Sequence, residues 1–321
     1  MKNLIKQIYP LADILLVPLV FISAFILKIV RKAGIRELPL CKGALLAVGV
    51  YPLRDHYYEP QFDFNAVTNS FAEMRSLPGI NFNIHEQLNI LKELAFSEEL
   101  KNIPINKSNL DVIDFYMNND SFSSGDAEYW YQLLRLKKPS KIFEIGSGNS
   151  TLMAITAIQK NKEDDPNYVC EHVCIEPYEM PWLESSGVTV VRKKVEDIDV
   201  SYFQKLDAGD ILFIDSSHII RPEGDVLFEY LQILPTLKIG VIVHVHDIFS
   251  PRNYPIEWVR DHVLFWNEQY LLEAFLSHNA SWKIIAALNY LHNEHYSALK
   301  KVCPFLTPVR QPGSFYMQRI A

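Results

Sequence analysis

The sequence is short of several features that mark familiar classes of protein. It has only four cysteines among 321 residues, and no two of them form a Cys-x-x-Cys pair. Sparse, unpatterned cysteine is typical of a reducing compartment. Basic residues are also in the minority, since the formal net charge is −7. A nucleic-acid partner is therefore not expected, because binding its phosphates requires a basic excess.

Three potential metal ligands stand close together, at Cys170, His172 and Cys174. They belong to a strand-like run over residues 168–175, in which alternate side chains share one face. A structural zinc site needs about four ligands, and no second cluster of ligands follows nearby. We therefore interpret these residues as buried members of a strand rather than as a zinc site.

Apolar residues make up 49% of the chain, and one long run of them stands near its start. This run, Leu11–Leu27, carries a single charge, Asp13, and is just long enough to span a membrane as a helix. We expect residues 1–38 to form a membrane anchor with a basic flank. The alternatives are an interfacial helix and a helix packed in the core.

The charges that flank this run are unequal, and they predict its orientation. More basic residues follow it than precede it, so the positive-inside tendency places the bulk of the chain in the cytoplasm. We expect a single-pass protein whose remaining domains face the cytoplasm. The basic residues are Lys2 and Lys6 before the run, and Lys28, Arg31, Lys32 and Arg36 after it.

Residues 39–124 carry no motif, and we expect them to form an extension with the role of a lid. The stretch Tyr51–Phe64 is rich in proline and aromatic residues and predicts an extended loop. A helix is expected over His85–Phe96 from the spacing of its apolar residues. The early loop contains His56, Tyr57 and Tyr58, which we place over a ligand crevice as a hypothesis.

From residue 141 onward, short apolar runs alternate with helical or loop segments. Such runs are typical of buried strands, and their alternation with helices predicts parallel crossovers. The last two runs have no clear crossover helix between them, which favours an antiparallel edge pair. We therefore expect residues 125–321 to form a doubly wound α/β domain with a seven-stranded, mostly parallel sheet, beginning with a helix over Asp126–Leu136. The runs are Lys141–Ile145, Val169–Ile175, Val188–Val191, Ile211–Ile214, Gly240–Val245, Trp282–Ala287 and Ser314–Arg319.

The strongest motif follows the first of these runs, at residues 143–151 (FEIGSGNST). Gly146 and Gly148 permit tight turns and close approach of a ligand, and Ser150 can cap the helix that follows. Glu144 ends the strand and offers a carboxylate. A second acid, Glu176, ends the next run, and acids at that position in doubly wound folds bind ribose hydroxyls.

The pattern Glu144-x-Gly146-x-Gly148-x-Ser150 resembles the first motif of class I S-adenosylmethionine-dependent methyltransferases. Ser150 stands where a third glycine is common in that family. The resemblance covers about residues 125–321 and implies a Rossmann-like fold and S-adenosylmethionine as cofactor. By this resemblance Glu176 would bind the ribose, and Glu196 and Asp197 would flank the adenine. The full set of expected cofactor-binding residues is Glu144, Gly146, Ser147, Gly148, Ser150, Glu176, Glu196, Asp197 and Asp215.

Two later strands also deliver acids and histidines to their carboxyl ends, where open α/β sheets place their ligands. Asp215 and His218 follow one strand, and His246 and Asp247 follow another. In the metal-dependent O-methyltransferases that the chain resembles, acids at these two tips hold a divalent cation. Asp215 and Asp247 are thus expected to bind Mg²⁺ or Mn²⁺. His246 stands where some of those enzymes have a second acid.

We assign catalysis to Asp215, His218 and His246, with His218 or His246 as the base that removes a proton from the acceptor. The expected reaction is methyl transfer to oxygen, or else nitrogen, of a small, saccharide or lipid-linked acceptor at the cytoplasmic membrane face. One alternative is an NAD(P)-dependent oxidoreductase, although the third glycine of a dinucleotide fingerprint is missing. A non-catalytic membrane scaffold is the other. The oligomeric state is left open.

Overall fold

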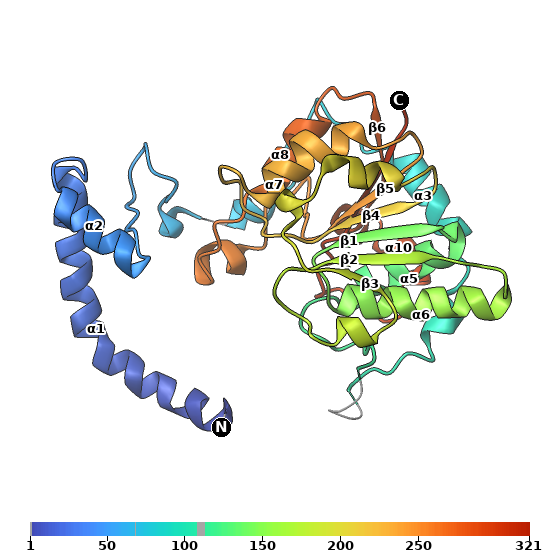
Figure 1. The fold of residues 1–321 in the computed structure, drawn as a ribbon, viewed down its shortest axis with the longest axis horizontal. Helices are drawn as coiled ribbons and strands as arrows, with labels where there is room; N and C mark the ends of the chain where they lie inside the picture. Colours follow the sequence, from blue (N-terminus) through green and yellow to red (C-terminus); the bar gives the residue numbers. More distant parts are fainter. Residues whose placement is uncertain (1, 68, 108–112) are drawn as a thin grey trace. The chain divides into compact units, whose positions relative to one another are not determined.

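The computed structural model describes residues 2–67, 69–107 and 113–321. The chain divides into two compact units, Met1–Thr68 and Asn69–Ala321, which are described separately. The first unit contains two helices, α1 (Lys2–Ala33) and α2 (Pro39–Val48), drawn in blue in Figure 1. The expected loop over Tyr51–Phe64 is present, apart from a short 3-10 turn that begins at Phe64.

Helix α1 contains the apolar run that the sequence places near the start of the chain. Its segment Tyr9–Ala33 has 25 residues and a mean hydropathy of 2.4, and none of its most apolar window is buried inside the protein. Pro18 lies inside this helix without ending it. By length and composition, α1 is able to cross a membrane.

The second unit is built on a seven-stranded sheet in the order β3-β2-β1-β4-β5-β7-β6 (Figure 1). The first five strands are parallel, and β7 pairs antiparallel with both β5 and β6. The predicted seven strands and antiparallel pair are confirmed, and β7 is inserted between β5 and β6. The strands are β1 (Lys141–Ile145), β2 (Glu171–Ile175), β3 (Thr189–Val191), β4 (Ile211–Ile214), β5 (Ile242–Val245), β6 (Trp282–Ala287) and β7 (Phe315–Arg319).

Alternate side chains of each strand enter two separate hydrophobic cores, one on each face of the sheet. Ile142 and Phe213 face a core that also contains Trp130 of α5. Phe143 and Leu212 face the other core. Burial on both faces explains why the strands are continuous apolar runs. The helices of this unit are α3 (Ile84–Glu93), α4 (Ser97–Leu100), α5 (Asp126–Lys137), α6 (Asn149–Asp164), α7 (Asp225–Phe228), α8 (Glu268–Leu276), α9 (Leu288–Glu294) and α10 (Tyr296–Val302), with short 3-10 and π-helical turns between them.

Helix α3 is shorter than the sequence predicts. It ends at Glu93, because the backbone of Leu94 is extended, with φ −73° and ψ 101°. The backbone N–H of Phe96 then donates to Oε1 of Gln132 at 3.0 Å instead of continuing the helix. Leu94 is nevertheless buried in the core, so its apolar character reports burial, which a helix and a loop can both provide.

Glu128 of α5 gives a prediction for the stability of this unit. Its buried carboxylate accepts from the backbone N–H of Gly125 at 2.9 Å and of Phe305 at 2.6 Å. Burial outweighs these donors and raises the pKa of Glu128 to about 7 from 4.5. Because the folded-state pKa is the higher one, the stabilisation is complete below pH 4.5 and is lost as pH rises through about 7.

We therefore expect the free energy of unfolding to fall by about 3 kcal/mol between pH 4.5 and pH 7 because of this group. Urea denaturation across this range measures the slope, and Glu128→Gln supplies the comparison, since glutamine does not titrate. The variant carries a constant penalty for one lost acceptor, so only the slopes are compared. Parallel pH profiles of the two proteins would contradict the prediction.

Candidate functional site

A pocket of ≈ 670 Å³ opens at the carboxyl ends of β1, β2 and β4. This is the edge of the sheet at which doubly wound folds bind ligands. Four of the predicted cofactor-binding residues line it, namely Gly146, Glu176, Glu196 and Asp215. The structure therefore brings together residues that lie far apart in the sequence, and it does so at the expected edge.

The loop after β1 approaches the strand beside it so closely that only glycine fits. Gly146 has φ +75°, and a Cβ atom there would lie 2.1 Å from the backbone oxygen of Asp215. Gly148 precedes the first residue of α6, and its N–H donates to Oγ1 of Thr151 at 3.0 Å. Ser147 is half-buried between the two glycines. Residues 146–148 thus form a loop and not part of a helix, as the motif predicts.

Glu144 supports this loop from behind and does not line the pocket. Its Oε1 accepts from Oγ of Ser150 at 2.5 Å, and its Oε2 lies 2.8 Å from Nε2 of His172. The Cys174 thiol lies 3.7 Å from the same oxygen, and burial raises the pKa of this thiol. These contacts tie the start of α6 to β1 and β2. Direct contact of Glu144 or Ser150 with a cofactor stays a prediction.

Glu176 lies at the tip of β2 and fixes the loop that follows it. Its Oε1 accepts from the backbone N–H of Tyr178 at 3.0 Å and of Glu179 at 3.1 Å. The residue is only 9% exposed, and it faces the pocket together with Glu196. Asp197 is exposed and lies outside the pocket lining.

A cluster of acids and histidines stands beside this pocket, at the tips of β4 and β5. Oδ1 of Asp215 lies 3.3 Å from Nε2 of His218 and 3.5 Å from Nδ1 of His246. Asp247 completes the cluster, with carboxylate oxygens 3.6 Å from each histidine. All four residues predicted from the two strand ends therefore meet in one place.

The structure adds Glu268, which the sequence analysis missed. This residue is fully buried at the start of α8, and its Oε2 lies 2.8 Å from Nδ1 of His218. Its Oε1 accepts from the Tyr230 hydroxyl at 3.0 Å. Trp266 covers His218 from one side, with ring centroids 4.3 Å apart. The only sequence signal was an acid at a helix start, which usually has a local reason.

In this cluster, attraction between opposite charges favours the ionised forms of Asp215, His218 and His246, which burial alone would disfavour. Burial disfavours the charged form of Asp215, but the charge of His246 and the close approach of both histidines outweigh it and lower the pKa of Asp215. Burial also opposes protonation of His218, and Asp215 and Glu268 together raise its pKa well above the usual value. The neighbouring carboxylates raise the pKa of His246 to about 10 despite its burial. Burial raises the pKa of Asp247.

Two residues of the cluster have backbone conformations that side chains other than glycine seldom adopt. His218 has φ 60° and Asp247 has φ 56°. Each such conformation costs on the order of 1–3 kcal/mol and concentrates at functional sites. The surrounding contacts enforce them: the carbonyl of His218 accepts from the N–H of Asn267 at 2.9 Å, and the N–H of Ile248 donates to the carbonyl of Gly313 at 2.8 Å.

The donor set of this cluster fits a divalent cation. One atom each from Asp215, His246 and Asp247 lies within 4.8 Å of the others. Neither ring nitrogen of His246 has a hydrogen-bond partner within the part of the chain that the structure describes. Two carboxylates and one imidazole suit Mn²⁺ better than Mg²⁺, which prefers oxygen donors alone. His246 was predicted as a base, and its position among the acids makes it a candidate ligand as well.

The segment that follows Asp247 brings further aromatic side chains to this site. Within residues 249–266, only Glu257–Asp261 is helical. Trp258 and Trp266 contact each other edge to face with centroids 5.2 Å apart. His56, Tyr57 and Tyr58 belong to the first unit, so their role as a lid stays a prediction.

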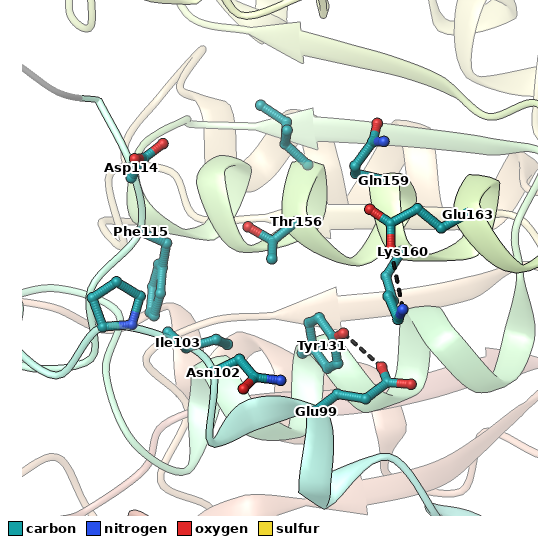
Figure 2. A pocket seen from close by; sticks show the side chains of 12 residues that line it. Glu99, Asn102, Ile103, Asp114, Phe115, Tyr131, Thr156, Gln159, Lys160 and Glu163 are labelled. Atoms are coloured by element: carbon teal, nitrogen blue, oxygen red, sulfur yellow. Dashed lines mark hydrogen bonds and ion pairs between the residues drawn. The ribbon is translucent and has the colours of Figure 1, made fainter.

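A further pocket, of ≈ 540 Å³, lies against α5 and α6 (Figure 2) and contains none of the predicted site residues. Four of its polar residues pair with one another. The Tyr131 hydroxyl donates to Glu99 at 2.6 Å, and Lys160 pairs with Glu163 at 3.1 Å. The acid–histidine cluster, in contrast, lies at the strand tips and includes a buried histidine whose ring nitrogens have no hydrogen-bond partner among the described residues. We take the pocket beside it as the candidate active site.

The comparison with protein families agrees with this assignment. Residues 143–248 match a family described as a methyltransferase domain. This segment is a methyltransferase domain. It begins in β1 and ends just after Asp247, so the match includes the glycine loop, Glu176 and the acid–histidine cluster. The oxidoreductase and scaffold alternatives are not favoured by this result.

A protein of Archaeoglobus fulgidus without an assigned function is 31% identical over 139 residues, 41% of this chain. The chain spans about three fifths of that relative, since the matched part is 61% of its length. This similarity assigns no activity and no acceptor to the chain.

Solved structures with a similar fold include an O-methyltransferase from Bacillus cereus in complex with SAH. It is 12% identical, with a TM-score of 0.38 over 73% of this chain and 91% of its own. A methyltransferase structure from Thermobifida fusca is 14% identical, with a TM-score of 0.40 over 76% and 98%. With scores below 0.5, these structures assign no ligand to the methyltransferase domain.

Proposed function

We propose that this protein transfers the methyl group of S-adenosylmethionine to a hydroxyl group of its acceptor. The observation that carries the proposal is one continuous site. The glycine loop and Glu176 line a pocket, and the acid–histidine cluster begins at Asp215 in the wall of that same pocket. A cofactor held by the first group would therefore present its methyl group near the second.

The parts of the pocket correspond to the parts of the cofactor. The backbone around Gly146 would bind its amino-acid end, and Glu176 would accept hydrogen bonds from its ribose hydroxyls. Glu196 stands one strand further along the sheet edge, on the side where the adenine would lie. Asp215 faces the region between these groups and the histidines.

The cluster supplies the proton acceptor that methyl transfer to oxygen requires. His218 is held by Asp215 and Glu268, which fix its ring and make it strongly basic. A cationic group bound beside Asp215 would lower the pKa of His218 again and so release its proton before turnover. Asp215, Asp247 and His246 would hold a divalent cation, which would acidify and orient the acceptor hydroxyl.

The acceptor that we propose is a small, saccharide or lipid-linked molecule at the cytoplasmic face of a membrane. Its support is helix α1, whose apolar segment is unburied and is followed by basic residues. An enzyme anchored in this way would act on molecules made or held at the membrane surface. Removal of residues 1–38 is expected to release the protein from the membrane fraction.

Isothermal calorimetry on the full-length protein tests the cofactor. We expect S-adenosylhomocysteine to bind and NAD⁺ not to bind. Glu176→Ala should lower the affinity for S-adenosylhomocysteine by about 10- to 100-fold, because one charge-assisted hydrogen bond to the ligand is lost. Glu176→Gln is the matched control, since it keeps an acceptor for Tyr178 and Glu179 and should lose less affinity. Binding of NAD⁺ alone would overturn the proposal.

A chelator tests the cation separately from the cofactor. Incubation with EDTA should abolish methyl transfer from tritiated S-adenosylmethionine into a membrane extract, and added Mn²⁺ should restore it. Affinity for S-adenosylhomocysteine should change little, because the expected cofactor contacts do not depend on Asp247. Full activity after removal of metal would exclude the cation and leave His218 to act alone.

A further inference from the structure

We infer that helix α2 lies in the surface layer of an anionic membrane as a second lipid contact, separate from the span of α1. The inference deepens the proposed anchoring and rests on it. It concerns the first unit alone, within the residues from α1 to Glu59. The partner that we assign to α2 is the lipid surface itself, specifically the boundary between headgroups and acyl chains.

The composition of α2 requires a partner that the described structure does not provide. Its sequence, PLCKGALLAV, has one charged residue, Lys42, and none of its residues is buried. Leu40 is 87% exposed and Val48 is 76% exposed. A helix that is apolar on nearly all sides is stable only when it is buried in protein or lipid. At 10 residues it is too short to span a membrane and has the length of an interfacial segment.

The charge of the surrounding segment selects anionic lipid as the partner. Residues 28–59 contain six basic residues and three acidic residues, a net charge of +3 in a chain whose total is −7. Each basic residue near an anionic bilayer strengthens binding through its attraction to the lipid headgroups. An apolar helix inside a basic segment thus matches both layers of the surface, the acyl boundary and the charged headgroups.

Contacts within the unit hold this segment close to the end of α1. Nη1 of Arg31 donates to the Tyr51 hydroxyl at 2.7 Å, and the guanidinium lies 5.0 Å from the centre of the same ring. Arg31 also pairs with Glu59, which lies 3.4 Å from Arg54 as well. The chain therefore leaves α1, passes through α2 and returns to the last turn of α1. If α1 spans the bilayer, α2 is confined to the depth at which that span ends.

The tip of the returning loop has the side chains that favour this depth. Tyr57 is 91% exposed and Tyr58 is 86% exposed, and their rings contact each other with centroids 5.0 Å apart. Tyrosine concentrates at membrane interfaces because its ring is apolar and its hydroxyl is polar. The loop would thus add an aromatic contact beside the apolar helix.

The test uses Cys41, an exposed residue on α2 itself. The full-length protein carries Cys170→Ser, so that labelling falls on Cys41 while Cys174 and Cys303 are buried. A fluorophore sensitive to polarity is attached there. The labelled protein is reconstituted into phosphatidylcholine vesicles with or without phosphatidylglycerol, using lipids that carry quenching bromines near the headgroup end of the acyl chains.

We expect shallow bromines to quench the label at least twofold more than bromines at the bilayer centre, and quenching to increase with phosphatidylglycerol. The double variant Leu40→Asp, Leu46→Asp should lose most of this quenching while still sedimenting with the vesicles through α1. The control Val169→Asp, at a 75% exposed position of the second unit, should change neither result.

Three outcomes would overturn the inference, and they are distinguishable. An unquenched label on protein that sediments with vesicles would overturn the role of α2 and leave the anchoring by α1 intact. Quenching that depends on protein concentration rather than on lipid would assign α2 to a second copy of the chain. Protein that does not sediment with vesicles at all would overturn the proposed anchoring and this inference with it.

Discussion

Replacement of Gly146 by valine is expected to abolish binding of S-adenosylhomocysteine, a loss of more than about 100-fold or roughly 2.7 kcal/mol. The reason is steric and local. A Cβ atom at this position would overlap the backbone oxygen of Asp215, and the φ of +75° also disfavours a branched side chain. The loop would have to move away from β4, and the pocket wall would move with it. Calorimetry on the purified variant measures the effect.

Gly209→Val is the matched control, because Gly209 has a similar φ of +87° but an added Cβ atom there would meet nothing within 4 Å. It should bind S-adenosylhomocysteine within about threefold of the unmodified protein, since Gly209 precedes β4 whereas the pocket lies at the carboxyl end of that strand. Circular dichroism and thermal unfolding show whether Gly146→Val remains folded. A folded Gly146→Val protein with normal affinity would refute the assignment of this loop to the cofactor.

Replacement of Asp215 by asparagine should lower methyl transfer by about 10²- to 10⁴-fold, the range that a positioned acid or base contributes. The change removes the carboxylate that lies between His218 and His246, and it keeps the size of the side chain. Affinity for S-adenosylhomocysteine should fall far less. The assay is transfer of tritium from labelled S-adenosylmethionine into a membrane extract.

The control for this experiment is Asp207→Asn. Asp207 is an exposed acid that pairs with Lys238 and Lys141, away from the acid–histidine cluster. It lies before β4, whereas Asp215 follows that strand. Its loss should leave turnover unchanged, because exposed ion pairs contribute little. Normal turnover in folded Asp215→Asn would mean that the cluster has no catalytic part.

The sequence was most informative where burial imposes a simple pattern. β1, β4 and β6 have the predicted bounds, because strands buried on both faces are uninterrupted apolar runs. The insertion of β7 between β5 and β6 was not predicted, since strand order depends on tertiary packing that no local pattern records. The early end of α3 was missed for a similar reason, because Gln132 takes the backbone N–H of Phe96 across 36 positions of sequence.

For the site, the sequence could identify residues that share a strand end but not those that arrive from elsewhere. Asp215, His218, His246 and Asp247 lie at tips of neighbouring strands, so topology alone brings them together. Glu268 reaches His218 from 50 residues away in the sequence. No periodicity, motif or spacing links the two, and only the packing of α8 against the sheet reveals the pair.

The inserted position of β7 has a consequence for the order in which the protein is made. β6 leaves the ribosome before β7, yet it pairs only with β7 among the described strands. Its apolar run therefore has no strand partner until β7 is synthesised. An exposed, unpaired strand of this kind is prone to aggregation and to chaperone binding. The residues just before β7 also contact the loop that holds Asp247, because the backbone N–H of Ile248 donates a hydrogen bond to the carbonyl of Gly313. The loop that holds Asp247 is consequently completed only after most of the sheet has formed.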